Sequence, residues 1–172
     1  AALRTRVATM TALPLAALGR VHAEPVRLNP GARQRVATRR KHGAHTLLVS
    51  GGFSYCTARV AADCGFGSEQ ANVLVDDGKA LTGAVREPIL GREAKFAALN
   101  KTCHTLGIET PNALAVGDGA NDLAMIKQAG LGVAYHAKPI VADAARARIS
   151  HGDLTALLYL QGYRDEEIVR AE

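Results

Sequence analysis

The sequence is poor in aromatic residues and has no tryptophan. Phe and Tyr together make up 4% of its 172 residues. The formal net charge is +5, but the 21 Lys and Arg residues are scattered along the chain. Proteins that bind nucleic acid use a basic stripe, usually with aromatic side chains on which bases stack. The composition therefore excludes nucleic acid as an expected partner.

Long apolar runs are also absent. None approaches the ~18 residues that a membrane-spanning helix requires, so we expect no membrane partner. The three cysteines, Cys56, Cys64 and Cys103, are odd in number and lack C-x-x-C spacing. This usage favours reduced thiols in a cytoplasmic protein. The six histidines form no H-x-H or H-E-x-x-H pattern, and no zinc site is expected.

What is present is an alternation of helical and strand patterns. A composition of 48% hydrophobic and 22% charged residues is typical of one globular domain. Periodicity predicts helices over residues 3–10, 15–22, 32–42, 54–64, 91–106, 122–129 and 140–147. Apolar runs predict strands over residues 46–49, 114–116 and 132–135, and residues 72–75 and 81–85 flank a turn as in a hairpin. The pattern predicts an α/β fold, a Rossmann-like parallel sheet with flanking helices.

The most informative segment is VGDGAND at residues 116–122, directly after an apolar run. Gly117 and Gly119 let a ligand approach the backbone closely. Asp118 and Asp122 are four residues apart, so one turn can direct both carboxylates toward a phosphate and a hard cation such as Mg²⁺. This pattern indicates phosphoryl transfer. The alternative is an ordinary strand-to-helix loop whose Asp residues cap the following helix.

The segment continues as LAMIKQAGLGVAYHAKP to residue 139. It resembles the fourth motif of bacterial phosphoserine phosphatases, members of the haloacid dehalogenase superfamily, and the similarity runs from about residue 3 to residue 163. The resemblance implies a haloacid dehalogenase-like core over residues 28–172, with a hairpin insert near 71–89. Residues 1–27 would then be the remnant of a helical cap domain.

A second motif, VSGGF at residues 49–53, follows the first predicted strand. Ser50 offers a hydroxyl and Gly51 an unobstructed N–H at a helix start, where an anion is favoured; a tight turn with a helix cap would look the same. In open parallel sheets, ligands bind beyond the carboxyl ends of the strands. The segment resembles the second motif of the family, whose Ser and following Gly bind the transferring phosphate.

The resemblance also assigns roles to isolated residues. Lys95 matches the cation of the third motif, which neutralises the charge of phosphate and nucleophile, and Arg6 matches the cap arginine that pairs with the substrate carboxylate. Asn121 corresponds to a side chain near the phosphate, Asp118 to a Mg²⁺ ligand, and Asp122 to a carboxylate that supports the metal shell. From pattern alone, Lys95 and Arg6 are solvated side chains on helices.

The chain departs from the family in one respect: it contains no D-x-D. The family's catalytic domain begins with a strand ending in D-x-D-x-T, where the first Asp is the nucleophile and the second is the general acid and base. The pair Asp76-Asp77 lies in the predicted hairpin turn instead. The sequence also starts without Met, and we expect an incomplete polypeptide that lacks the N-terminal segment of the family.

This departure leads to two expectations. The family's first strand lies between the strands that end near Ser50 and Asp118, so we expect a break in the sheet there and poor folding. Losing about five buried aliphatic residues at ~1.5–3 kcal/mol each is comparable with the ~5–15 kcal/mol stability of a domain. We also expect the chain alone to be inactive, because nothing remains to attack phosphorus.

The resemblance thus implies the activity of a phosphoserine phosphatase, which hydrolyses O-phospho-L-serine to L-serine and phosphate with Mg²⁺ in serine biosynthesis. Another small-molecule phosphatase of the superfamily is a second reading, disfavoured by the SGGF and AYHAKP segments. Cation pumps share the G-D-x-x-N-D motif but require membrane spans. The reading from a different class is a non-catalytic phosphate-binding protein that retained the rest of the fold.

Overall fold

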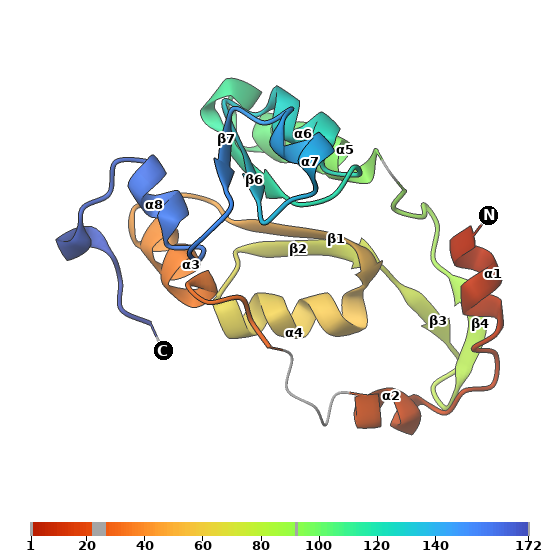
Figure 1. Cartoon of the computed structure of the whole chain (residues 1–172). Helices are drawn as coiled ribbons and strands as arrows, with labels where there is room; N and C mark the ends of the chain where they lie inside the picture. Colours follow the sequence, from red (N-terminus) through yellow and green to blue (C-terminus); the bar gives the residue numbers. More distant parts are fainter. Residues whose placement is uncertain (1, 22–26, 92, 172) are drawn as a thin grey trace.

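The computed structural model describes residues 2–21, 27–91 and 93–171. Figure 1 shows three groups of elements: a two-stranded sheet in the middle, a three-stranded sheet above it, and a helix–hairpin unit at one end. The longest helix described has 12 residues, and no described helix combines the length and apolar character of a membrane span.

The central group contains β1 (Leu47–Phe53) and β2 (Ser68–Asn72), which pair in parallel. Helix α4 (Ser54–Cys64) packs against both strands, and α3 (Ala32–Lys41) packs against α4 (Figure 1). The predicted bounds of α4 are confirmed. It ends because Gly65 adopts a left-handed φ of 76°, a conformation that favours glycine and closes the last turn.

The second group is a parallel sheet in the order β5 (Leu114–Gly117), β6 (Leu131–Tyr135), β7 (Ala147–Ile149). Its helices are α5 (Ala94–Thr105), α6 (Leu123–Gln128), α7 (Pro139–Ala142) and α8 (Ala156–Leu160). Short 3-10 turns occur at η1 (Thr110–Asn112) and η2 (Asp165–Glu167). The parallel strands and flanking helices confirm the predicted fold class.

The core of this group lies on the two faces of β6. On one face Ile126 and Val141 pack with Ala134, and on the other Val133 packs with Ile149 and Leu157. Burial of strand residues on both faces is what a parallel strand between two helical layers requires. This packing fixes the carboxyl ends of β5 and β6 relative to α6.

The third group consists of α1 (Ala2–Ala8), α2 (Leu15–Val21) and the hairpin β3 (Leu74–Asp76) and β4 (Leu81–Val85). The N–H of Ala12 donates to the Leu81 carbonyl at 2.8 Å, and the Leu81 N–H donates to the Leu13 carbonyl at 2.9 Å. Helix α1 packs against β4 (Figure 1). The first residues and the hairpin therefore form one packed unit. The end of the predicted helix over 15–22 lies outside the described residues.

Two segments were assigned to the wrong element. Residues 72–75 were expected to form one strand of the hairpin, but Asn72 ends β2, a strand that the pattern did not reveal. Residues 68–70 are Ser, Glu and Gln, so β2 has no apolar run, and its pairing with β1 decides its structure. The helix predicted over residues 140–147 ends at Ala142, and Ala147 begins β7, because that segment pairs with β6.

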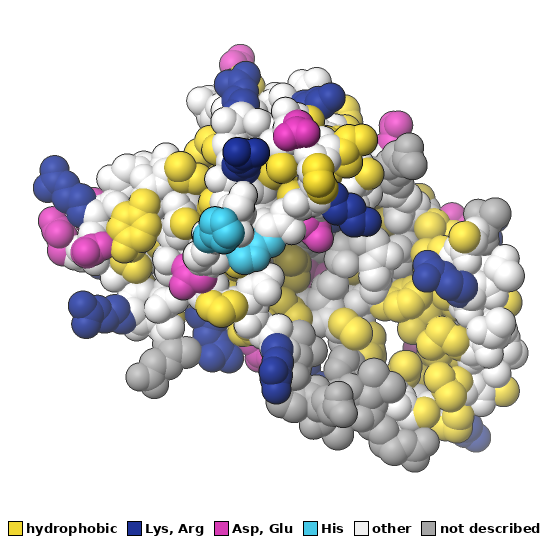
Figure 2. Space-filling view, viewed as in Figure 1, with side chains coloured by type: hydrophobic (Ala, Val, Ile, Leu, Met, Phe, Trp, Pro, Cys, Tyr) yellow, Lys and Arg dark blue, Asp and Glu magenta, His cyan; other side chains and the backbone are white. Residues whose placement is uncertain are grey.

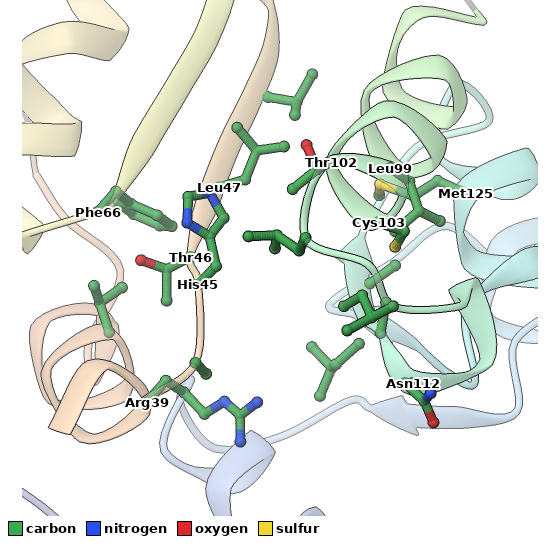
Figure 3. Close-up of a pocket in the computed structure, with 18 of the residues that line it drawn as sticks. Arg39, His45, Thr46, Leu47, Phe66, Leu99, Thr102, Cys103, Asn112 and Met125 are labelled. Carbon is green, nitrogen blue, oxygen red and sulfur yellow. The ribbon is translucent and has the colours of Figure 1, made fainter. Parts of the chain in front are cut away.

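The expected break in the sheet is confirmed. Within the described residues, β1 pairs with β2 and β5 pairs with β6, but no hydrogen-bonded pairing joins β1 to β5. A cavity of about 480 Å³ lies between them, and we call it the slot. It is lined mainly by Val36 of α3, Leu47 and Val49 of β1, Leu99 and Cys103 of α5, Leu114 and Ala115 of β5, and Met125 of α6. Figure 3 shows Leu47 on one wall and Leu99 and Met125 on the opposite one.

We expect the 172-residue chain to unfold without a sharp cooperative transition. No backbone pairing joins the two sheets in the described residues, and the cavity of about 480 Å³ between them lacks the packing contacts that would couple their unfolding. Differential scanning calorimetry and binding of a hydrophobic dye test this. A single sharp calorimetric transition without dye binding at 25 °C would contradict it.

Candidate active site

The loop after β5 is organised around one buried carboxylate. Asp122 is 1% exposed, and its Oδ2 accepts hydrogen bonds from the N–H groups of Asp118 (3.1 Å) and Gly119 (3.0 Å). A Cβ on Gly117 would lie 2.4 Å from the Cβ and Cγ of Asp122. Position 117 therefore requires glycine, because the Asp122 carboxylate approaches its backbone too closely for a side chain. The loop folds back over this carboxylate.

Lys95 completes this arrangement from another element. Its Nζ lies 2.5 Å from Oδ1 of Asp122, with side chains 19% and 1% exposed. Lys95 lies in the first turn of α5, and Asp122 immediately precedes α6. A carboxylate this deeply buried requires a cation or several donors, and here it has both. Of the predicted site residues, these two are brought into direct contact.

Asp118 has the opposite environment. Its side chain is exposed, and in the described part of the chain its carboxylate has no hydrogen-bond partner. Its backbone carbonyl accepts from the Lys138 N–H at 3.2 Å, which holds the loop against the segment after β6. Asp122 makes no side-chain cap on α6, because its carboxylate points back into the loop. The simple capping alternative therefore does not describe Asp122.

Asn121 and Ser50 lie near the ends of β5 and β1. Asn121 is exposed, and its Oδ1 lies 2.6 Å from where a Cβ on Gly119 would be. Ser50 was expected in a turn after the strand, but β1 continues through it to Phe53, and its Oγ accepts the Gly52 N–H at 3.0 Å. Gly51 is exposed, with open space around the position of a Cβ. The backbone at Gly51 is thus accessible to a ligand.

Sequence reasoning missed Asn72, which anchors this strand end. Asn72 is 2% exposed, its Nδ2 donates to the Gly51 carbonyl at 2.9 Å, and its Oδ1 accepts the Leu90 N–H at 2.7 Å. It therefore links the end of β1 to the segment that leads into α5. A single Asn in a polar stretch carries no periodic signal, so only the pairing of β2 with β1 reveals its position.

Lys95 also connects the two sides of the slot. It lines the slot together with Val49, the residue before Ser50, and Ala115, three residues before Asp118. Asp118 lines a second cavity of about 400 Å³ with Tyr135 and His136. The ends of β1 and β5 thus lie on opposite sides of the space that Lys95 borders.

Arg6 is not joined to these residues. It is exposed on α1, and in the described residues no hydrogen bond or ion pair links its side chain to Ser50, Lys95 or the 118–122 loop. Its neighbour Arg4 pairs with Glu87 at 2.5 Å, and this hydrogen bond, with one from the Ile89 N–H, lowers the pKa of the Glu87 carboxyl. Figure 2 shows basic side chains dispersed over the visible face, without a continuous stripe.

The pair Asp76-Asp77 has a structural role. Asp76 accepts the Gly78 N–H at 2.9 Å, and Asp77 accepts the N–H groups of Lys79 and Ala80 in the turn between β3 and β4. These backbone donors lower the pKa of the Asp77 carboxyl. The expected position of Asp76 and Asp77 in a hairpin turn is confirmed. Both carboxylates accept backbone hydrogen bonds that form this turn.

The described residues contain no group of three or more His, Cys, Asp and Glu placed as ligands of one metal ion. Mg²⁺ in phosphoryl-transfer sites is commonly held by one or two carboxylates together with phosphate oxygens and water. The exposed, unpartnered Asp118 carboxylate fits one such position. Asp122 does not offer a second, since Lys95 and two N–H groups already engage it.

Replacing Asp122 by Ala should lower the free energy of local opening of the 118–122 loop by about 3–5 kcal/mol, because Lys95 would lose its partner and the loop its acceptor. Native-state hydrogen exchange of the Asp118 and Gly119 amides measures the change. Lys127→Ala is the matched control: it lies on α6, is exposed, and should change stability by less than about 0.5 kcal/mol. Equal effects of the two substitutions would show that the ion pair is unimportant.

Gly117→Ala should displace the Asp122 carboxylate, because the added Cβ would lie 2.4 Å from two of its carbon atoms. We expect loss of amide-exchange protection in the 118–122 loop. Gly91→Ala is the control, since nothing lies within 4 Å of its Cβ position. Retained protection of the Asp118 and Gly119 amides in Gly117→Ala would contradict this account.

Comparison with known proteins shows the family of the chain. The family model for haloacid dehalogenase-like hydrolases matches residues 1–127. A phosphoserine phosphatase of Polaromonas sp. is 43% identical over 162 residues, covering 92% of this chain and 69% of the relative. A phosphoserine phosphatase of Streptomyces coelicolor is 40% identical over 171 residues, covering 99% of this chain but 41% of the relative.

Solved structures agree. A probable phosphoserine phosphatase from Vibrio cholerae in its unliganded form has a TM-score of 0.88 at 34% identity, over 93% of this chain and 49% of that one. A phospho-aspartyl intermediate analogue of a phosphoserine phosphatase has a TM-score of 0.77 at 36% identity, over 92% of this chain and 75% of that one. The chain thus spans less than half of the Streptomyces and Vibrio proteins. With a family model that covers most of its length and these relatives, the chain belongs to the haloacid dehalogenase-like hydrolases.

Proposed function

We propose that the chain provides the phosphate-binding and metal-binding part of a phosphoserine phosphatase, which hydrolyses O-phospho-L-serine to L-serine and phosphate. One observation carries the proposal: the Lys95–Asp122 pair, with its ends 2.5 Å apart, holds a cation beneath a loop that leaves the Asp118 carboxylate free. A fixed cation beside a free carboxylate is the arrangement that a phosphate and Mg²⁺ require together. The relatives named above act as phosphoserine phosphatases, which supports this substrate.

Each residue then has a role that follows from its environment. The Ser50 hydroxyl and the accessible Gly51 N–H bind phosphate oxygens at the end of β1. The Lys95 ammonium neutralises developing negative charge, and Asp122 is a positioning residue that holds Lys95 and the loop. Asn121 donates to a phosphate oxygen from the loop. Mg²⁺ bound at Asp118 would supply further neutralisation of the phosphate.

Substrate selection requires a group for the serine carboxylate. A guanidinium suits bidentate capture of a carboxylate, and we assign this role to Arg6 on α1. Because α1 packs on the β3–β4 hairpin, Arg6 would approach the substrate as part of that unit. Residues 1–27 with the hairpin would then act as a cap over the core formed by the rest of residues 28–172. All three cysteines are free thiols, which supports a cytoplasmic location.

This chain does not show the groups that would break the phosphate ester bond. Its 172 residues contain no D-x-D, so they offer neither the nucleophile for an aspartyl-phosphate nor the acid that protonates the leaving serine oxygen in the expected positions. The chain would therefore bind the reactants without turnover unless a segment with those carboxylates enters the site. A non-catalytic phosphate-binding role is the second candidate, and the open slot beside Lys95 favours it.

We expect the 172-residue chain alone to release no phosphate from O-phosphoserine with Mg²⁺, because losing a covalent nucleophile typically removes 10⁵-fold or more of the rate. Adding a co-expressed segment that ends in D-x-D-x-T should restore phosphate release, since binding would replace the missing burial. The measurement is phosphate release by the chain alone and by the complemented chain.

Two controls make this assay decisive. In the complemented chain, Asp118→Asn should abolish turnover, whereas Lys127→Ala, exposed on α6 and outside the site, should leave it unchanged. Turnover by the chain alone that disappears in Asp118→Asn would mean that another residue of this chain is the nucleophile. A complemented chain that binds phosphate but stays inactive would favour the non-catalytic function.

A further inference from the structure

Strand β1 loses its regular pairing with β2 within the VSGGF segment. Val49 lies opposite Gln70 and Phe53 lies opposite Asn72, so β1 advances by more residues than β2 between these two pairs. Residues inserted at such an irregularity have no regular partners in the ladder. The inserted stretch, residues 50–52, reads Ser-Gly-Gly, and two adjacent glycines leave its backbone conformationally free. A group other than the neighbouring backbone must therefore fix this stretch.

The side chain of Asn72 supplies this constraint. It is 2% exposed, its Nδ2 donates to the Gly51 carbonyl at 2.9 Å, and its Oδ1 accepts the Leu90 N–H at 2.7 Å. A backbone N–H can only donate and a carbonyl can only accept, so these two partners determine which end of the amide faces which way. A buried amide with both ends bonded holds its partners in place.

This amide also determines the direction of the Gly52 N–H. The Gly51 carbonyl and the Gly52 N–H belong to one planar trans peptide, in which they point to opposite sides. Because Asn72 holds the carbonyl, the Gly52 N–H is directed away from it, and the Oγ of Ser50 accepts this N–H at 3.0 Å. Asn72 therefore acts on Ser50 through a single peptide group.

The bond accepted by the Ser50 oxygen decides what the hydroxyl hydrogen can do. A serine hydroxyl can accept through its oxygen and still donate its one hydrogen. Among residues 2–21, 27–91 and 93–171, no acceptor takes the hydrogen of the Ser50 hydroxyl. The hydroxyl is thus oriented by the backbone and keeps its donor for an anion, which is the role that the proposed function gives it.

The other bond of Asn72 reaches the segment that carries the lysine of the site. Leu90 lies between β4 and α5, and Lys95 is in the first turn of α5, which packs against β1. One side chain is therefore bonded both to the strand end with Ser50 and to the connection that leads to Lys95. Its removal would loosen two phosphate-binding segments at once.

We propose that Asn72 is a positioning residue for phosphate binding. By holding the Gly51 carbonyl, it directs the next N–H to the Ser50 oxygen, and the Ser50 hydroxyl hydrogen is left to donate to a phosphate oxygen. The inference rests on the proposed phosphate site and deepens it. Asn72 itself does not contact phosphate, because both ends of its amide already have partners.

Binding of inorganic phosphate to the 172-residue chain, followed through NMR shifts of the backbone amides, tests this role. Asn72→Leu keeps nearly the same shape but can make neither hydrogen bond. It should weaken phosphate binding at least about tenfold, the loss expected for one hydrogen bond to a charged group. Asn100→Leu is the matched control and should leave the affinity unchanged, because Asn100 is exposed on α5 and does not line the slot.

A double-mutant cycle with Ser50→Ala distinguishes action through Ser50 from a general structural effect. If Asn72 acts through the Ser50 hydroxyl, Asn72→Leu should weaken phosphate binding by less than about threefold once Ser50→Ala is present. Losses that multiply to about a hundredfold in the double variant would show that Asn72 acts on another part of the site, and would overturn the inference.

A second measurement uses chains in which Asn72 is intact, so it does not depend on the folding of Asn72→Leu. Phosphate should shift the side-chain NH₂ resonances of Asn72 together with the Gly52 amide, because one peptide group connects them to Ser50. At equal occupancy both shifts should be smaller in Ser50→Ala. The side-chain resonances of the exposed Asn100 should not move. Unmoved Asn72 resonances in a phosphate-bound chain would contradict the proposed coupling.

Loss of this coupling gives a different pattern from loss of the phosphate site itself. Phosphate binding that Ser50→Ala weakens and Asn72→Leu does not would overturn the inference alone. An unmodified chain in which phosphate shifts neither the Gly51 nor the Gly119 amide would refute the phosphate site, and the role of Asn72 with it.

Discussion

The contact between Lys95 and Asp122 is the constraint on which the site depends. It joins the start of α5 to the start of α6, and through the second oxygen of Asp122 it also fixes the backbone after β5. The Asp122 carboxylate is 1% exposed, and a buried charge of this kind is stable only when it has a counter-ion or hydrogen-bond donors. Lys95 and the loop N–H groups supply these partners, and Gly117 leaves the space that the carboxylate needs. The free side chain of Asp118 follows from this: the loop is shaped by Asp122, which leaves Asp118 available to solvent and ligand.

The slot imposes a second constraint, which acts on the relative placement of the two halves of the site. Ser50 and Gly51 belong to the sheet of β1 and β2, whereas the 118–122 loop belongs to the sheet of β5, β6 and β7. No backbone pairing connects these sheets in the described residues, so their separation depends on side-chain contacts such as those of α5 with β1, beside a cavity of about 480 Å³. A close-packed interior without such a cavity would hold the two sheets more rigidly relative to each other.

Local signals in the sequence predicted those elements whose structure is decided locally. Helix α4 was bounded correctly because Gly65 can close it with a left-handed conformation, and the loop at 117–122 was located because glycines and carboxylates follow an apolar run. Strands β2 and β7 were missed, since both are defined by pairing with a neighbour. The break in the sheet could be expected only from the family's architecture, because no sequence pattern within the chain indicates that a neighbouring strand is missing.

The same distinction explains which site residues could be found. Asp118 and Asp122 stand in a motif, and Lys95 was assigned only through the family resemblance. Asn72 and Arg35 gain their significance from burial that tertiary contacts create. Arg35 is the clearer case: on α3 it is one of several basic residues, and only the slot turns its Nε into an unsatisfied donor. Asn72 shows the consequence for the site: its amide joins the Gly51 carbonyl to the Leu90 N–H, so one side chain that no motif marks holds the end of β1 against the segment that leads into α5.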